Sequence, residues 1–161
     1  MSADVFESLV GDLEYPMLVV TAATAGERAG CLVGFATQTS IDPGRYLVCI
    51  SKANRTHRVA SEAEALAVHF LPADREDLAE LFGGQTGDEV DKFARCEWRE
   101  GPRGLPIVAG CVNWFAGEVL ERFDLGDHTG FLLQPVAGER GAPVSQFPFH
   151  RARRIDPGHE A

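Results

Sequence analysis

The feature that most constrains the fold is a succession of short apolar runs joined by polar turns. Residues 17–23 and 29–36 form two such runs, and only a turn around Gly26 separates them. A short polar connection between two β-like runs predicts a hairpin. Parallel strands need a crossover of a dozen or more residues, which this connection cannot hold. The pattern therefore predicts an antiparallel sheet and excludes a doubly wound parallel one.

The rest of the chain extends this pattern with few helices. Helical spacing covers residues 3–13, 56–64 and 74–82, and 88–93 forms another short helical turn. Residues 37–44 and 98–104 are predicted as a polar turn and a loop. Residues 138–161, rich in Gly, Pro and Arg, lack periodicity and are expected to form a loose C-terminal arm. Further strands are predicted at residues 46–51, 66–71, 105–108, 111–123 and 131–136.

Six or seven hairpin-linked strands with short inserted helices fit a closed or nearly closed antiparallel barrel with a Greek-key arrangement. The fold class is thus mainly β, an antiparallel barrel, and the family resemblance described below implies that this barrel is a split β-barrel. A length of 161 residues favours a single domain over 1–161. We expect its core to occupy about residues 15–137.

Charge and composition exclude several classes of partner. A net charge of −9 argues against nucleic acid and against an anionic membrane surface. No apolar run approaches the roughly 20 residues of a membrane span, and no basic leader precedes an apolar segment. The four cysteines are scattered without metal-ligand spacing, so no metal is expected. A reducing, cytoplasmic location is the expectation.

Several familiar catalytic patterns are missing. The chain has no GxGxxG after its first strand and no GxxxxGK[ST], which argues against a Rossmann site and a P-loop. It also lacks GxSxG and HExxH. Any phosphate-binding site must therefore use another arrangement.

Residues 51–56 offer such an arrangement. If Asn54 or Thr56 caps the helix that follows, free backbone N–H groups point outward at the positive end of its dipole. Lys52 and Arg55 add positive charge, and Ser51 adds a hydroxyl. The alternative is an ordinary capped helix with solvated basic side chains.

A second candidate segment lies just upstream. Thr37, Thr39 and Ser40 follow a strand that carries the small residues Gly34 and Ala36. Small side chains let a planar ring approach the backbone closely. The alternative is a polar hairpin turn without a ligand.

His128 is the histidine that points most clearly to a ligand. It lies in the turn Gly126-Asp127-His128-Thr129, and a turn does not require an imidazole. The alternative is an exposed turn histidine. His69, inside a strand, is predicted to be a hydrogen-bonded core or interface residue. His57 is left open, and His150 and His159 are expected to be solvated.

Taken together, these segments resemble the flavin reductase-like family of FMN-binding split barrels, over about residues 15–136. Residues 30–43 resemble the family's G-x-T-A-S-S-F-x-S-V-S-x-D-P stretch, and residues 51–57 its S-x-x-S-x-T segment. Asp91-Lys92-Phe93 is similar to D-[RK]-F, and residues 126–129 match G-D-H-[ST]. The chain departs from the family in Leu32-Val33-Gly34, where Thr-Ala-Ser is common, and in Asn54, where serine is usual.

The resemblance implies a set of site residues. His128 would place the nicotinamide, and Phe93 would pack near the flavin. Residues lining the flavin ring would be Val33, Gly34, Phe35, Ala36, Thr37, Thr39 and Ser40. Residues holding the phosphate would be Ser51, Lys52, Asn54, Arg55 and Thr56.

The activity implied by the resemblance is hydride transfer from NADH or NADPH to FMN, with FAD as the other flavin. It also implies a homodimer and a flavin-dependent monooxygenase that receives the reduced flavin. Two alternatives remain open. One is a flavin-binding electron carrier or oxidase without NAD(P)H reductase activity, and the other is a scaffold that binds no flavin.

Overall fold

The computed structural model describes residues 2–84 and 91–155. Its helices are α1 (Ala3–Gly11), α2 (Arg55–Glu62), α3 (Glu76–Gly84) and α4 (Phe149–Ala152), with the 3₁₀ turns η1 (Lys92–Ala94) and η2 (Pro102–Gly104). Its strands are β1 (Leu18–Thr24), β2 (Glu27–Val33), β3 (Ala36–Ile41), β4 (Gly44–Ser51), β5 (Ala65–Phe70), β6 (Trp98–Glu100), β7 (Pro106–Val108), β8 (Trp114–Asp124) and β9 (His128–Glu139).

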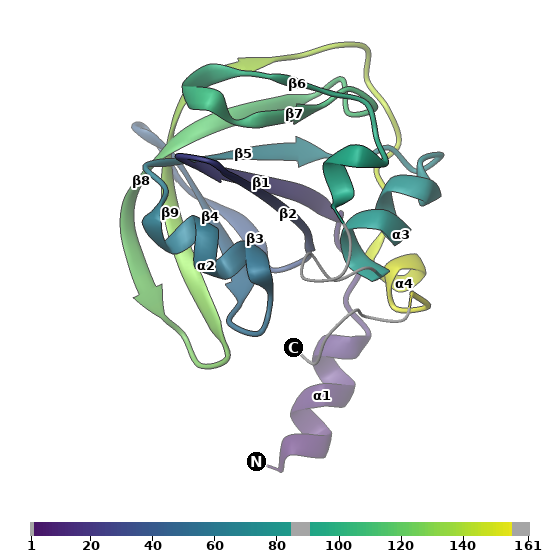
Figure 1. Cartoon of the computed structure of the whole chain (residues 1–161). Coiled ribbons are helices and arrows are strands. Elements are labelled where there is room, and N and C mark those ends of the chain that lie inside the picture. The colour runs from purple at the N-terminus through teal and green to yellow at the C-terminus, as the bar shows by residue number, and fades with distance from the viewer. Residues whose placement is uncertain (1, 85–90, 156–161) are drawn as a thin grey trace.

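Seven strands form one antiparallel sheet in the order β2-β1-β5-β8-β9-β4-β3. The sheet curls around a central core, and α2 lies in the connection between β4 and β5 (Figure 1). Strands β6 and β7 pair separately. The predicted fold class, a mainly β antiparallel split barrel with short inserted helices, is confirmed.

Strand β1 is mostly apolar, and its first five residues are buried on both faces. Leu18 and Val20 point into the barrel core, whereas Val19 packs with Leu71 and Phe82 in a second cluster beneath α3. Successive side chains of a strand point to opposite faces, so a doubly covered strand reads as a continuous apolar run. This second cluster is where the C-terminal segment joins the barrel.

His69 is the polar residue at the centre of this arrangement. It is fully buried, its Nδ1 lies 2.8 Å from the Val19 carbonyl oxygen, and the Val108 N–H donates to its Nε2 at 3.0 Å. These partners require a neutral ring that carries its proton on Nδ1. Burial lowers its pKa to about 4. The prediction of a hydrogen-bonded core histidine is confirmed.

The predicted turn at residues 37–44 is wrong, since most of it is strand β3. β3 pairs with β4 along one edge, with a bulge between Gln38 and Ser40. Its polar residues are largely exposed, so it lacks the apolar alternation of a half-buried strand. The predicted loop at 98–104 also contains regular structure, because Trp98 pairs with Val108 in the short β6–β7 ladder.

The described part of the predicted C-terminal arm, residues 138–155, is not loose. The Met17 N–H donates to the Phe147 carbonyl, the Phe147 N–H to Leu71, and the Phe149 N–H to Tyr15. Phe147 is fully buried. Tertiary backbone pairing therefore fixes a segment that has no periodicity of its own.

Other predicted boundaries and histidines differ in detail. His150 is not simply solvated: its ring contacts the Glu14 carboxylate and the Gly11 carbonyl. Of the predicted helical turn at 88–93, residues 88–90 lie outside the described residues, as does His159. The strand predicted at 111–123 begins at Trp114, and the run predicted at 29–36 is divided between β2 and β3.

Helix α1 extends away from the barrel (Figure 1). Ser2 caps it, and none of its residues is buried. Its apolar side chains Val5, Phe6 and Leu9 are each at least half exposed. No helix in the described part of the chain is both long and apolar enough to span a bilayer.

Candidate functional site: a cavity at the start of α2

A cavity of about 300 Å³ lies between the ends of β2 and β4 and the C-terminal segment. One end reaches the loop before α2, and the β8–β9 turn borders its mouth. Its lining is mostly apolar. The lining residues are Tyr15, Met17, Cys31–Phe35, Cys49–Ser51, Asn54, Phe82, Gly83, His128, Phe149, Ala152, Arg153 and Ile155.

The polar end of the cavity is formed by Ser51 and Asn54. Asn54 caps α2, and its Oδ1 accepts from the Thr56 N–H at 2.9 Å. Its amide NH₂ forms no hydrogen bond with the residues that the structure describes. The Ser51 hydroxyl accepts from the Ala53 N–H, so its own proton stays available to donate. Both side chains thus offer donors where a helix N-terminus favours an anion.

The two predicted cations beside this end already have carboxylate partners. Lys52 Nζ lies 2.6 Å from Asp124 Oδ1, and Arg55 Nη2 lies 3.1 Å from Glu27 Oε2. The hydrogen bond from Lys52 lowers the pKa of Asp124. Neither basic side chain lines the cavity. They belong to its surroundings.

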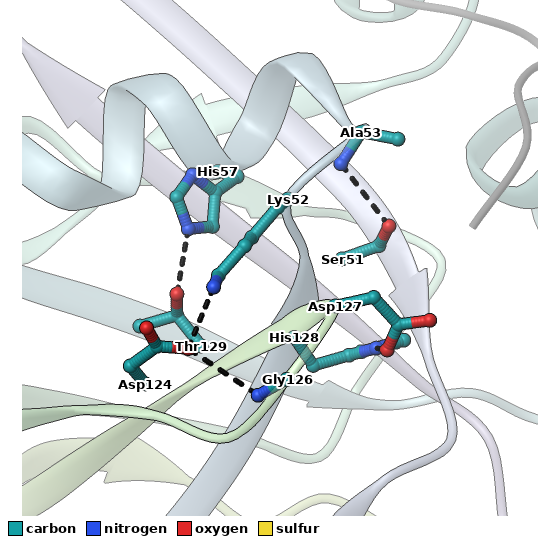
Figure 2. A network of polar contacts seen from close by, with 9 residues as sticks. All are labelled: Ser51, Lys52, Ala53, His57, Asp124, Gly126, Asp127, His128 and Thr129. Carbon is teal, nitrogen blue, oxygen red and sulfur yellow. Dashed lines mark hydrogen bonds and ion pairs between the residues drawn. The ribbon is translucent and has the colours of Figure 1, made fainter.

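The β8–β9 turn is fixed against the start of α2, as Figure 2 shows. The Lys52 N–H donates to the Asp127 carbonyl, and His57 Nε2 lies 2.8 Å from the Thr129 hydroxyl. Burial, and then the charge of Lys52, lowers the pKa of His57. These contacts hold the turn next to the polar end of the cavity.

His128, predicted in this turn, is instead the first residue of β9, where it pairs with Ser51 and lines the cavity. Its Nδ1 lies 2.7 Å from Asp127 Oδ1, and its ring lies 5.0 Å from that of Phe35. The hydrogen bond with His128 lowers the pKa of Asp127. A carboxylate at Nδ1 orients the imidazole and leaves Nε2 for another partner.

The predicted site residues therefore divide into two groups. Val33, Gly34 and Phe35 line the cavity together with Ser51, Asn54 and His128. The remainder lie elsewhere in the single chain: Ala36, Thr37, Thr39, Ser40, Lys52, Arg55, Thr56 and Phe93.

Thr56 and Phe93 lie behind the cavity wall. Thr56 is 1% exposed, and its hydroxyl is hydrogen-bonded to the Cys31 thiol. Burial raises the pKa of that thiol to about 11. Phe93 packs edge-on against Phe82, with ring centroids 5.9 Å apart, and Phe82 faces the cavity.

The sequence analysis missed one wall of the cavity, which Tyr15 forms together with Phe149 and Arg153. Tyr15 and Phe149 stack with ring centroids 4.4 Å apart and an interplanar angle of 18°. Arg153 extends this wall and donates to the Gly11 carbonyl. The alternation of Phe147 and Phe149 was the available signal, since one is buried in the core and the other faces the cavity.

A larger hollow of about 520 Å³ lies between the β1–β2 turn and η2. Its lining includes Glu62, Glu64 and Glu100, and none of the predicted site residues contributes to it. It has no apolar wall of aromatic side chains. The smaller cavity is therefore the better candidate for a flat organic ligand.

Comparison with known proteins identifies the family. Residues 10–154 match the profile of the "Flavin reductase like domain". The chain belongs to this family. It is 32% identical over 124 residues to a probable flavin reductase of Rhizobium meliloti (strain 1021), which covers 74% of this chain and 39% of that protein. It is 34% identical over 113 residues to the stachydrine N-demethylase reductase subunit Stc3 of the same organism, covering 68% of this chain and 48% of the relative.

A solved structure agrees with this family assignment. The Streptomyces globisporus C-1027 NADH:FAD oxidoreductase SgcE6 superposes with a TM-score of 0.83 at 26% identity, covering 98% of this chain and 90% of that one. The chain spans less than half the length of the two Rhizobium relatives.

Proposed function

We propose that this flavin reductase-like chain is an NAD(P)H-dependent flavin reductase that transfers hydride from NADH or NADPH to FMN, with FAD as the alternative flavin. The observation that carries the proposal is the cavity, which joins an apolar, aromatic-lined body to donor groups at the start of α2. The names of the relatives support the same reaction class.

The residues present fit a flavin mononucleotide. Its flat ring system matches the apolar walls, and its phosphate matches the donors of Ser51 and Asn54 at the helix N-terminus. Gly34 lies at a close approach, because an added Cβ would lie 2.9 Å from Tyr15 Cε2. The absence of a side chain at this position lets Tyr15 and Met17 pack directly against the backbone of the cavity wall.

Each part of the cavity has a role in this proposal. Bound flavin supplies the redox chemistry, accepting a hydride, and the protein supplies orientation and water exclusion. Ser51 and Asn54 hold the phosphate, and Lys52 exchanges Asp124 for it. Tyr15 and Phe149 exclude water from the ring. Because hydride passes between two cofactors, no acidic or basic side chain has to move a proton at the reacting atoms.

His128 is proposed to contact the nicotinamide. Asp127 fixes its ring, so Nε2 is left to face a ligand at the cavity mouth. His128→Ala should raise the KM for NADH by about tenfold, the equivalent of one lost hydrogen bond. Flavin affinity should stay within about twofold, since the phosphate donors are untouched. An unchanged KM would remove His128 from the nicotinamide site.

We further propose a homodimer in which a second copy covers the mouth of the cavity. Phe35 is 54% exposed and Ile41 87% exposed, and both flank the polar face of β3. Covering this edge would enclose Ala36, Thr37, Thr39 and Ser40 and bring them to the flavin. Phe93 and Thr56 would then support the ring and the phosphate from behind Phe82 and Cys31.

The proposal includes a partner monooxygenase and a cytoplasmic location. Stc3 is named as the reductase subunit of a demethylase, which supports delivery of reduced flavin to a partner monooxygenase. All four cysteines are free thiols, which supports a reducing, cytoplasmic location.

The reaction is tested by mixing flavin-loaded protein anaerobically with NADH or NADPH in a stopped-flow instrument. Rapid loss of the oxidised-flavin absorbance with either nucleotide is expected. Tight flavin binding with no reduction by either nucleotide would favour the electron carrier or oxidase. An unperturbed free-flavin spectrum on mixing with FMN would favour the scaffold.

A further inference from the structure

Lys92 is a buried lysine that forms no ion pair with any carboxylate of the residues that the structure describes. It is 5% exposed, and its Nζ donates to the carbonyl oxygens of Gly30 at 3.0 Å and Phe82 at 3.1 Å. Its ammonium also lies 5.7 Å from the Phe82 ring centroid. Within residues 2–84 and 91–155, no carboxylate forms an ion pair with it.

This arrangement is unusual for a protein with a net charge of −9. Buried charges are ordinarily paired, because removing an ion from water is costly. The two neutral carbonyls accept hydrogen bonds from the Lys92 ammonium but do not neutralise its charge. Burial accordingly lowers the pKa of Lys92. Burial thus works against the charged form, and the two carbonyl hydrogen bonds hold the Lys92 amine in the protein interior.

Lys92 lies behind the floor of the cavity, on the side of α2. Lys92, Arg55 and Thr56 line the same narrow crevice. The charge of Lys92 also acts on Cys31, which lines the cavity and is hydrogen-bonded to Thr56. A short buried path therefore runs from Lys92 through Cys31 and Thr56 to the helix N-terminus.

Unlike Lys92, the two basic side chains next to the N-terminus of α2 form ion pairs with carboxylates. Lys52 and Arg55 are neutralised by Asp124 and Glu27, and both pairs are partly open to solvent. Salt and water weaken such exposed pairs. A buried charge is screened much less, so it acts over a longer distance.

We propose that Lys92 is a positioning residue that strengthens binding of the flavin phosphate from behind the cavity floor, without touching it. This rests on the proposed function, which places the phosphate at the start of α2. Asp91 lines the same crevice, but its carboxylate accepts from the Phe93 N–H and forms no ion pair with Lys92. The anion of the ligand would supply a negative charge that no described carboxylate provides to Lys92 by direct pairing.

The test compares FMN with riboflavin, which lacks the phosphate. Dissociation constants of both are measured for the wild type, Lys92→Met, Lys92→Gln and Lys92→Arg. The Met and Gln variants should bind FMN about tenfold more weakly and riboflavin within about twofold. Lys92→Arg should keep the preference for FMN. Lys92→Gln retains a donor for the two carbonyls and carries the test if the Met variant does not fold.

Salt gives a second, independent readout, with Lys52→Met as the matched control. The loss in Lys92→Met should persist at high salt, whereas the loss in Lys52→Met should fade. Equal weakening of FMN and riboflavin by Lys92→Met and Lys92→Gln would overturn the proposal and make Lys92 a structural tether. An unchanged FMN preference in both would also overturn it. A wild type without any FMN preference would instead refute the proposed phosphate site.

Discussion

The start of α2 and strand β3 both carry small and hydroxyl-bearing residues, yet the barrel places them differently. Ser51 and Asn54 face a cavity and are fixed by capping and by the neighbouring β8–β9 turn. β3 is an edge strand whose polar residues are largely exposed, and Ile41 is 87% exposed. The first segment lines a cavity within one chain. The second faces solvent in the single chain, and only the proposed dimer would cover it.

This difference shows that residue types alone do not define a site. The loop before α2 sits at a helix N-terminus, where unpaired donors gather on one side. β3 sits at a sheet edge, where pairing groups and side chains face solvent. The same residue types therefore line a cavity in one place and are exposed at a sheet edge in the other.

The largest expected effect is on the folding stability of the barrel that carries both regions. His69 has a pKa of about 4 in the folded protein, against about 6.5 when unfolded. Between these values the unfolded state binds more protons, so stability should fall as the pH drops from about 6.5 to about 4, by about 3 kcal/mol in total. Urea unfolding across this pH range measures the effect.

His69→Gln is the control for this prediction. It removes the titrating ring from the contacts with Val19 and Val108, so it should be less stable at neutral pH but show a flatter pH profile. If wild type and variant lose stability in parallel on acidification, His69 is not the responsible group.

A smaller effect, on flavin affinity, should distinguish the start of α2 from strand β3. Asn54→Ala removes the α2 cap, which costs about 1 kcal/mol of folding stability. It also removes an amide donor, so FMN affinity should fall about tenfold, with riboflavin changed far less. Titration calorimetry with both flavins measures this difference.

Two variants sharpen the result. Asn54→Ser keeps a good cap and should recover most of the stability. Thr39→Ala on β3 should change flavin affinity by less than about twofold when it is made in a monomeric form of the protein. A larger loss from Thr39→Ala than from Asn54→Ala would reverse the assignment of the two regions.

The smallest expected effect on folding stability comes from a substitution at the exposed edge of β3. Ile41→Asp should change folding stability by no more than about 0.5 kcal/mol, because the side chain is already exposed. It should weaken self-association, since a charge replaces an apolar contact. Sedimentation velocity measures this, with Leu120→Asp on β8 as the control. Unchanged association of Ile41→Asp would argue against a dimer through β3.

Much of the barrel could be predicted because its signals are local. The hairpin of β1 and β2 follows from two apolar runs and a short turn, and the cap of α2 follows from Asn54 before Arg55. The core position of His69 follows from its place inside an apolar strand. In each case the deciding interactions involve residues close in sequence, or a burial pattern visible along one strand.

The missed elements depend on contacts between distant segments. β3 is held by pairing with β4, although its exposed faces give no apolar alternation. The C-terminal arm is fixed by backbone bonds to Tyr15, Met17 and Leu71. Such hydrogen bonds use groups that every residue carries, so they leave little trace in the sequence.

The sequence by itself determined the antiparallel barrel, the helix cap that forms the polar end of the cavity, and the presence of a histidine directly after the β8–β9 turn. Only the tertiary structure decided which candidates meet around one cavity. It paired Lys52 with Asp124, placed Tyr15 against Phe149, and buried Lys92 against two backbone carbonyls. Backbone propensity and burial patterns act locally, whereas charge pairing and cavity walls depend on which distant segments the folded sheet brings together.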